Sequence, residues 1–463
     1  MKEAKFQNDL TQGGVAGQLI RFSAPFLLSM LIQQSFSMAD LLIVSYFANE
    51  AAVAAVNNGA QLTFLAIAIA IGFSVGGTIV IGQFYGAKKY DEVKKTTATL
   101  LTSLLVGSIV LSAIFIVGSN VFLRLMQVPE ESFREAWLYL VICMSGLPFI
   151  FLYNAIAAVL RGLGDSKRPL YFIACACAAN IILDLVLVAG LGIGVMGVAI
   201  ATVVAQMGSV FASAIYLSRS GFLFDFRPRS FTIDRSRLKL ILRIGIPAGI
   251  SQIAVNLSFL LLTTLVNGYG VSVAAAAGLA GRFSGFAIMP MIAVSNSVAM
   301  MCAQNFGANR HDRALKTMKT GIFICIAIGF PLFFIIQLFG TQIMGIFSNS
   351  EAVVKAGTIY ITAFSWDYLI VPFLFCFFGL VNGAGHSHIT MINTFITSIA
   401  VRMPVAIIFS QTLDMGLRGI GLAIPVSSLS GFFFLLSYIM TGKWKNVVIH
   451  KHIEKSAALE KEE

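Results

Sequence analysis

Three acidic side chains inside long apolar stretches are the first residues in this sequence that could do chemistry. Of the 21 acidic residues, only Asp40, Asp184 and Asp367 fall within segments apolar enough to cross a membrane. A carboxylate is costly to hold in a bilayer, so such a residue is a functional candidate by default. An interhelical hydrogen bond or ion pair would also explain each of the three.

Neutral oxygen donors accompany the first two acids. Asn180 precedes Asp184 by one helical turn and shares its face, and Thr202 lies in the next apolar segment. At 1.5 Å per residue, Asp40, Asp184 and Thr202 lie roughly 9–12 Å from the outer ends of their helices. Carboxylate, amide and hydroxyl oxygens at one depth suit a proton relay or a hard cation such as Na⁺. The sequence alone leaves open whether these faces meet.

The second half of the chain carries different charges. The position that corresponds to Asp40 is Leu262, and the intramembrane charges are Arg282 and Arg402, together with Asp367. We expect ion chemistry to be concentrated in the first half. The arginines are expected to brace helices through backbone carbonyls or Asp367, although a role in substrate binding stays open.

The composition requires a membrane around these residues. The 463 residues are 57% hydrophobic and 11% charged, whereas soluble domains are about 25% charged. Apolar runs of about 20 residues or more predict an all-α protein with 12 transmembrane helices. The expected spans are 17–47, 51–84, 96–119, 135–160, 169–190, 194–218, 238–267, 272–304, 317–340, 353–380, 389–410 and 417–441.

The basic residues predict the orientation. Most of the 32 Lys and Arg residues lie in loops on one side. The opposite side has only Arg124, Arg134, Lys355 and Arg418. The positive-inside rule therefore places both termini of this multi-pass inner-membrane protein in the cytoplasm. The net charge of +11 follows from this distribution, and no nucleic-acid partner is predicted.

The chain also repeats itself at an offset of 221–222 residues. Three pairs of segments correspond: 21–25 with 243–247, 83–87 with 304–308, and 162–166 with 383–387. Two parallel six-helix repeats are a common transporter design. We predict an N-terminal six-helix lobe with the ion-coupling site (1–218), a basic cytoplasmic linker (219–237), a C-terminal six-helix lobe (238–442) and a charged cytoplasmic tail (443–463).

Several motifs are missing from the sequence. It has no G-x-x-x-x-G-K-[ST] phosphate loop and no H-E-x-x-H, and its six cysteines include no C-x-x-C pair. We therefore expect no ATP drive within this chain, no enzyme activity, no cofactor and no firm metal site. The rival functions are a lipid-linked oligosaccharide flippase of similar fold and, from another class, a membrane-embedded lipid-modifying enzyme.

The ordered motifs resemble the multidrug and toxin extrusion (MATE) family, from about Gly17 to Gly442. The similar stretches are Pro25 through Asp40 to Ala54-Ala55-Val56, Gly82-Gln83 with Gly86-Ala87, Leu160 to Ser166, Asn180 with Asp184, Gly197 with Ala201-Thr202, and Arg402 with Pro404. The resemblance implies antiporters that export bulky, often cationic compounds through a V-shaped pair of six-helix lobes.

The resemblance also implies roles for single residues. Asp40, Asn180, Asp184 and Thr202 match the proton- or sodium-binding positions of the branch with an acid in the first helix. Pro25 matches a proline at which that helix bends. The second branch has its acids in the C-terminal lobe, but segment 238–267 here contains none, so no role is carried over to Asp367.

The sequence therefore predicts a secondary active multidrug exporter driven by H⁺ or Na⁺. Drug-like molecules are expected to bind against Gln34, Ser37, Asn57 and Asn154 in a protein that works as a monomer among membrane lipids.

Overall fold

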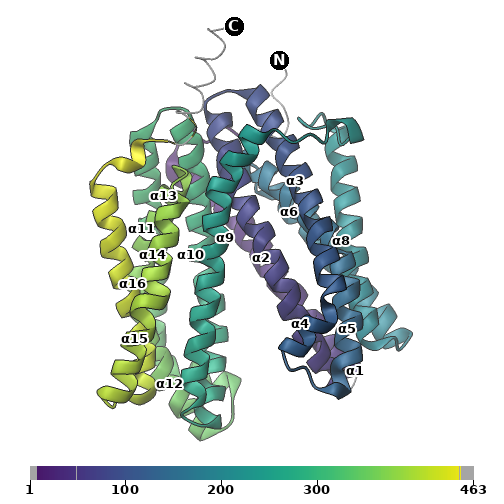
Figure 1. Ribbon diagram of the computed structural model, residues 1–463. Helices are drawn as coiled ribbons and strands as arrows, with labels where there is room; N and C mark the ends of the chain where they lie inside the picture. The colour runs from purple at the N-terminus through teal and green to yellow at the C-terminus, as the bar shows by residue number, and fades with distance from the viewer. Residues whose placement is uncertain (1–7, 48–49, 448, 450–463) are drawn as a thin grey trace. The chain divides into compact units, whose positions relative to one another are not determined.

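The structure is a computed structural model that describes residues 8–47, 50–447 and 449. The described chain is almost entirely helical (Figure 1). The first half contains α1 (Val15–Phe47), α2 (Glu50–Gly86), α3 (Tyr90–Val117), α4 (Ser119–Leu125), α5 (Glu130–Ser145), α6 (Leu147–Gly162), α7 (Lys167–Asp184), the π-helix η1 (Leu185–Gly190), α8 (Gly194–Arg219) and the short η2 (Pro228–Ser230). The second half contains α9 (Arg235–Asn267), α10 (Val271–Gly307), α11 (His311–Phe347), α12 (Glu351–Ser365), α13 (Asp367–Gly383), α14 (Ser387–Phe395), η3 (Ile396–Val401), α15 (Arg402–Ile407), η4 (Ile408–Thr412), α16 (Gly416–Met440) and η5 (Lys443–Lys445).

The predicted helical membrane fold is confirmed. Ten helices of the described chain are long and apolar enough to span a membrane, and the number reaches 12 when each of two bent pairs counts as one span. The bent pairs are α5 with α6 and α12 with α13, each with a 45° change of direction. These breaks lie inside the spans predicted at 135–160 and 353–380.

The predicted repeat is visible in the backbone. The turn after α2 is closed by a hydrogen bond from Lys89 N to Phe84 O (3.0 Å), and the turn after α10 by one from Arg310 N to Asn305 O (2.8 Å). Gly164 and Gly385 have positive φ angles of 85° and 87° in corresponding turns, a conformation that glycine adopts without a Cβ clash. The broken spans recur as well.

The chain forms two compact units. Unit 1 contains Ala24–Gly249 together with the residues before Leu10, and unit 2 contains Leu10–Ser23 together with the residues from Ile250 onward. The division therefore falls inside α1 and inside α9. Pro25 and Pro247 each lie within three residues of it. Both helices continue through their proline.

Glycines bring α9 close to α2 within unit 1. Gly72 and Gly76 on α2 face Gly245 and Gly249 on α9, so that a Cβ at Gly72 would lie 2.7 Å from Gly245 O. Small residues at this four-residue spacing let helix backbones approach closely in a membrane. The first half of α9 is thereby fixed to unit 1.

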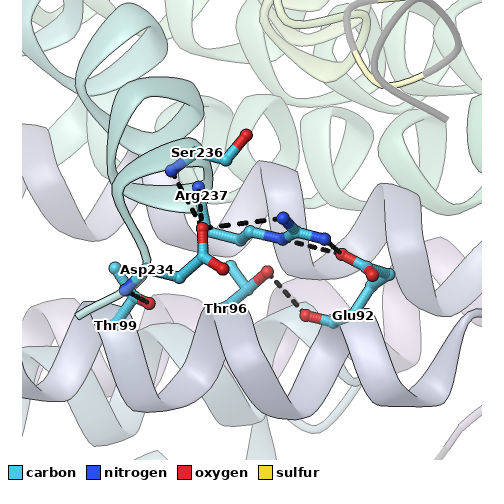
Figure 2. A network of polar contacts seen from close by, with 6 residues as sticks. All are labelled: Glu92, Thr96, Thr99, Asp234, Ser236 and Arg237. Carbon is cyan, nitrogen blue, oxygen red and sulfur yellow. Dashed lines mark hydrogen bonds and ion pairs between the residues drawn. The ribbon is translucent and has the colours of Figure 1, made fainter. Parts of the chain in front are cut away.

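The end of the basic linker is fixed to α3 (Figure 2). Arg237 forms an ion pair with Glu92, and the backbone N–H of Asp234 donates to Thr99 Oγ1 (3.0 Å). Asp234 Oδ1 accepts the N–H groups of Ser236 (2.8 Å) and Arg237 (3.0 Å), which caps α9. Partial burial alone would raise the pKa of Asp234, but the Arg237 N–H, the Arg237 charge and the Ser236 N–H outweigh it, so this pKa lies below its ordinary value.

Candidate ion-coupling site

The structure brings the four predicted coupling residues together inside unit 1. Asp40 lies on α1 and Thr202 on α8, and the Thr202 hydroxyl donates to Asp40 Oδ2 over 3.4 Å. Asn180 lies one turn before Asp184, the last residue of α7. The charge of Asp184 acts on Asp40, and the Asn180 side chain faces the same carboxyl group. Three helices thus supply oxygens to one point.

The site is almost closed to solvent. Asp40 is 6% exposed, and Asn180 and Asp184 are fully buried at 0%. Beneath the site, α6, α7 and α8 pack through a small apolar core of Tyr153, Ala157, Ile173, Ala176 and Val210. The low-dielectric surroundings strengthen electrostatic interactions between the two carboxyl groups.

Several polar atoms at this site are buried without a hydrogen-bond partner among the described residues. They are Asp40 Oδ1, both carboxylate oxygens of Asp184 and both polar atoms of the Asn180 side chain. Each buried unpaired polar group costs about 1–3 kcal/mol, and more when it is charged. A proton shared between the carboxyl groups, or a Na⁺ held by these oxygens, would relieve both the missing contacts and the repulsion. The donor set therefore fits either ion as a transported cargo.

A backbone irregularity begins directly after Asp184. The π-helix η1 covers Leu185–Gly190, and single π-helical turns inside α-helices are frequent at functional sites. Unit 2 has two π-helices: η4 (Ile408–Thr412) occupies the corresponding place, and η3 (Ile396–Val401) comes earlier in the same span. The hydropathy pattern gave no signal for any of the three.

One neighbour of the site was missed by the sequence reasoning. Tyr139 on α5 is 6% exposed, and the charges of Asp40 and Asp184 both act on it. Its ring lies against Gly59, where an added Cβ would come within 3.1 Å of the ring atom Cε1. In a sequence, an aromatic residue in an apolar helix is indistinguishable from an ordinary core residue. No sequence signal therefore identified Tyr139.

The predicted substrate-binding residues are not assembled in the same way. Gln34 and Asn57 are exposed, and Asn154 is half-buried with its side-chain amide donating to Ile150 O (2.8 Å). No hydrogen bond joins these three side chains within the part of the chain that is described. The side chain of Ser37 lies outside the described residues.

The predicted hinge proline lies in an ordered stretch of α1. Pro25 O accepts the Ser29 hydroxyl (2.9 Å), and the next residue, Phe26, packs under the Arg161 guanidinium with 4.5 Å to the ring centroid. α1 is assigned as one continuous helix through this point. Pro25 does mark the place where α1 passes from unit 2 to unit 1.

The intramembrane charges of unit 2 form a separate centre. Arg402 is 8% exposed, and its guanidinium donates to the hydroxyls of Ser427 (3.2 Å) and Ser258 (3.4 Å). Asp367 is 4% exposed, and the Arg402 charge acts on it. Arg282, in contrast, is exposed. The structure therefore associates Asp367 with Arg402 and leaves Arg282 apart.

Among the described residues, no group of three or more His, Cys, Asp or Glu side chains could hold a metal ion. The coupling site has two carboxylates, with amide and hydroxyl oxygens as its remaining donors. That set suits a weakly held, exchangeable monovalent cation better than a resident divalent metal.

Comparison with known proteins identifies the family. The MatE family model matches residues 25–186 and 247–408, one match for each repeat. The chain is 30% identical to the probable multidrug resistance protein YoeA of Bacillus subtilis over 94% of its length and 95% of that protein. It is 29% identical to the probable multidrug resistance protein YpnP of the same organism, over 94% of its length and 97% of that protein. A solved outward-facing multidrug resistance MATE family transporter superposes with a TM-score of 0.87 at 23% identity, covering 94% of this chain and 98% of that one. This multi-pass membrane protein therefore belongs to the MATE family of multidrug transporters and is not an enzyme.

Proposed function

We propose that the protein exports drug-like molecules in exchange for H⁺ or Na⁺, and that the ion binds in unit 1 at Asp40, Asn180, Asp184 and Thr202. The observation that carries this proposal is the set of buried, unpaired polar atoms that α1 and α7 place around two carboxyl groups, with the Thr202 hydroxyl of α8 beside them. Such an arrangement is unfavourable by itself and becomes favourable when a cation occupies it.

Ion binding would change the energy of the site in two ways. A proton on one carboxyl group, or a Na⁺ between both, removes the repulsion between Asp40 and Asp184 and completes the coordination of the neighbouring oxygens. Release of the ion restores the unfavourable state, so occupancy favours one arrangement of α1, α7 and α8 over another. The membrane potential adds about 2.3 kcal/mol per charge for each 100 mV.

The names of the relatives support multidrug export as the transport reaction. Bulky, often cationic, amphipathic compounds are the proposed substrates, with binding against Gln34, Ser37, Asn57 and Asn154. The proposed topology has both termini in the cytoplasm, because the basic residues predict it. The working form is proposed to be a monomer that needs no cofactor besides the coupling ion.

The test is export driven by an imposed gradient in proteoliposomes. Asp40→Asn and Asp184→Asn should each abolish drug efflux driven by a pH or Na⁺ gradient. Neither variant should melt at a lower temperature, because a neutral amide is cheaper to bury than a carboxylate. Separate pH and Na⁺ gradients distinguish the two coupling ions.

Asp367→Asn serves as the matched control for a buried acid. Asp367 lies in unit 2, and its Oδ1 is also buried without a hydrogen-bond partner, but the groups that act on it are Arg402 and Ser428 rather than a second carboxyl group. Its replacement should leave gradient-driven efflux largely intact, and any effect should be on which drugs are carried. If both unit 1 variants keep gradient-driven efflux and Asp367→Asn loses it, the coupling site belongs to unit 2 and the proposal is wrong.

A further inference from the structure

Unit 2 contains a groove lined by basic residues, and these residues are distant in sequence from the candidate coupling residues. The groove measures about 650 Å³, a size suited to a lipid headgroup or small ligand. Its lining comes from the turn between α10 and α11, the first turns of α11, and the short η5 helix after α16. The lining residues are Asn309, Arg310, His311, Asp312, Arg313, Lys316 and Lys445.

The groove holds four cationic side chains and a single carboxylate, Asp312. Arg310, Lys316 and Lys445 are exposed, and none of these three forms an ion pair with any described residue. Arg310 donates to a backbone carbonyl, Thr11 O (2.7 Å), which carries no formal charge. The positive charge on the groove is therefore not neutralised by the described part of the protein.

The walls of the groove are fixed in place. On one side, Arg313 donates to the carbonyl oxygens of Gly13 (2.8 Å) and Gln12 (2.9 Å), which attaches the start of the chain to α11. On the other side, Trp444 is 2% exposed, and its indole N–H donates to Ile439 O (2.9 Å). The Lys445 ammonium lies 5.7 Å from the Trp444 ring centroid. The backbone that carries the basic side chains is therefore held in place before a ligand binds.

The charges at the corresponding position of unit 1 are different. At the repeat offset of 221 residues, the counterpart of Arg313 is Glu92, and Glu92 forms an ion pair with Arg237 (Figure 2). The two units thus attach an incoming chain segment at the same point with opposite charges. The positive-inside rule explains basic residues on this side of both units, but it does not by itself explain the groove that the basic residues of unit 2 line.

We propose that this groove binds the phosphate of an anionic phospholipid headgroup. The groove lies at the ends of two membrane-spanning helices: its lining follows Gly307, the last residue of α10, and includes His311, the first residue of α11. With 37 residues, α11 is about 55 Å long. The hydrocarbon core is about 30 Å thick, so α11 extends into the headgroup region. The inner leaflet is rich in anionic lipid and attracts basic segments. The inference uses the proposed orientation but not the proposed ion coupling.

The test measures lipid binding to the full-length protein in neutral detergent by native mass spectrometry. The probes are phosphatidylglycerol, phosphatidylcholine with the same acyl chains, and inorganic phosphate. Each basic residue near a membrane surface is worth about 1 kcal/mol towards anionic lipid, so Lys316→Gln/Lys445→Gln should weaken phosphatidylglycerol binding roughly 30-fold. Phosphatidylcholine binding should be weak and unchanged.

A matched variant separates the groove from general surface charge. Lys89→Gln/Lys94→Gln removes two exposed lysines from the same side of unit 1 and should keep wild-type affinity. Thermal melting checks that both double variants are folded. Equal losses in the two variants would overturn the proposal, and so would inorganic phosphate binding as tightly as the lipid. The glutamates at the end of the charged tail are the competing occupant: a large gain of lipid binding in Glu460→Gln/Glu462→Gln/Glu463→Gln would show that the groove binds the tail instead.

Discussion

The contact between α2 and α9 gives a sharp test of how the chain divides into two units. Gly76 lies on α2 where α9 passes, and a Cβ added there would contact Ile241 O, Gly245 N (2.9 Å) and Gly245 Cα (3.1 Å). All of these atoms belong to the backbone, so no side-chain rotation can relieve the clash. Gly76→Ala must therefore push the two helices apart.

The size of the effect follows from two opposing terms. Ordinary contacts between carbon atoms are about 3.5–4.0 Å, so the helices would have to separate by roughly 0.5–1 Å. Overpacking of this kind costs about 1–3 kcal/mol. Alanine is favoured over glycine within a helix by about 0.5–1 kcal/mol, which offsets part of the cost. We expect Gly76→Ala to lower the free energy of unfolding by about 1–2 kcal/mol.

The assay is thermal melting of the purified protein in detergent, where this change should lower the melting temperature by a few degrees. Gly281→Ala is the matched control, because Gly281 lies in the middle of α10 with no atom within 4 Å of the added Cβ. It should melt at or slightly above the wild-type temperature. If Gly76→Ala behaves like Gly281→Ala, the close approach of α2 and α9 is refuted.

Three further predictions concern α9, α1 and the topology. Asp234→Ala removes the cap of α9 and should cost about 1 kcal/mol at pH 7. Because the pKa of Asp234 is lowered by folding, this stabilisation is present above the unfolded-state pKa of about 3.9 and disappears as pH falls through the lower folded value. Melting of variant and wild type should therefore converge as the pH is lowered below the unfolded-state pKa of Asp234, and a constant difference would argue against the charged cap. Pro25→Ala restores a backbone N–H inside α1 and should slow transport in proteoliposomes without unfolding the protein; unchanged rates would remove the hinge role. Cysteines at Arg229 and Gly345, both exposed, should react with a membrane-impermeant maleimide from opposite sides in a cysteine-free background, and labelling of both from outside would reverse the proposed topology.

The sequence predicted the spans and the repeat because hydropathy and loop chemistry are local properties. It did not predict the breaks at Gly146 and Trp366, because the two helices on either side of each break are together apolar enough to be taken as one span. At the first break, the side chain of Val203 packs against Gly146. Packing partners distant in the sequence leave no periodic signal.

The candidate coupling residues could be identified from the sequence for a similar reason. A carboxylate in an apolar segment stands out without any knowledge of its neighbours, so Asp40 and Asp184 could be identified and their depths estimated. The convergence of α1, α7 and α8 could not be derived, because periodicity gives the face of a helix but not the helix opposite. Gln34 and Asn57 illustrate the limit of this approach. Both were predicted to bind substrate from their positions on a helix, and both side chains are exposed.

The two repeats separate what the scaffold needs from what the chemistry needs. Corresponding turns, broken spans and π-helices recur in both halves, so they belong to the common fold. The charges do not recur: Asp40 corresponds to the buried Leu262, and Glu92 corresponds to Arg313. Because Leu262 takes the place of Asp40, unit 2 has no carboxylate at that position to bind a cation. An arginine in place of Glu92 turns an internally neutralised attachment into part of a basic groove. Duplication of one six-helix scaffold thus allowed each half to acquire its own charged site while the backbone stayed the same.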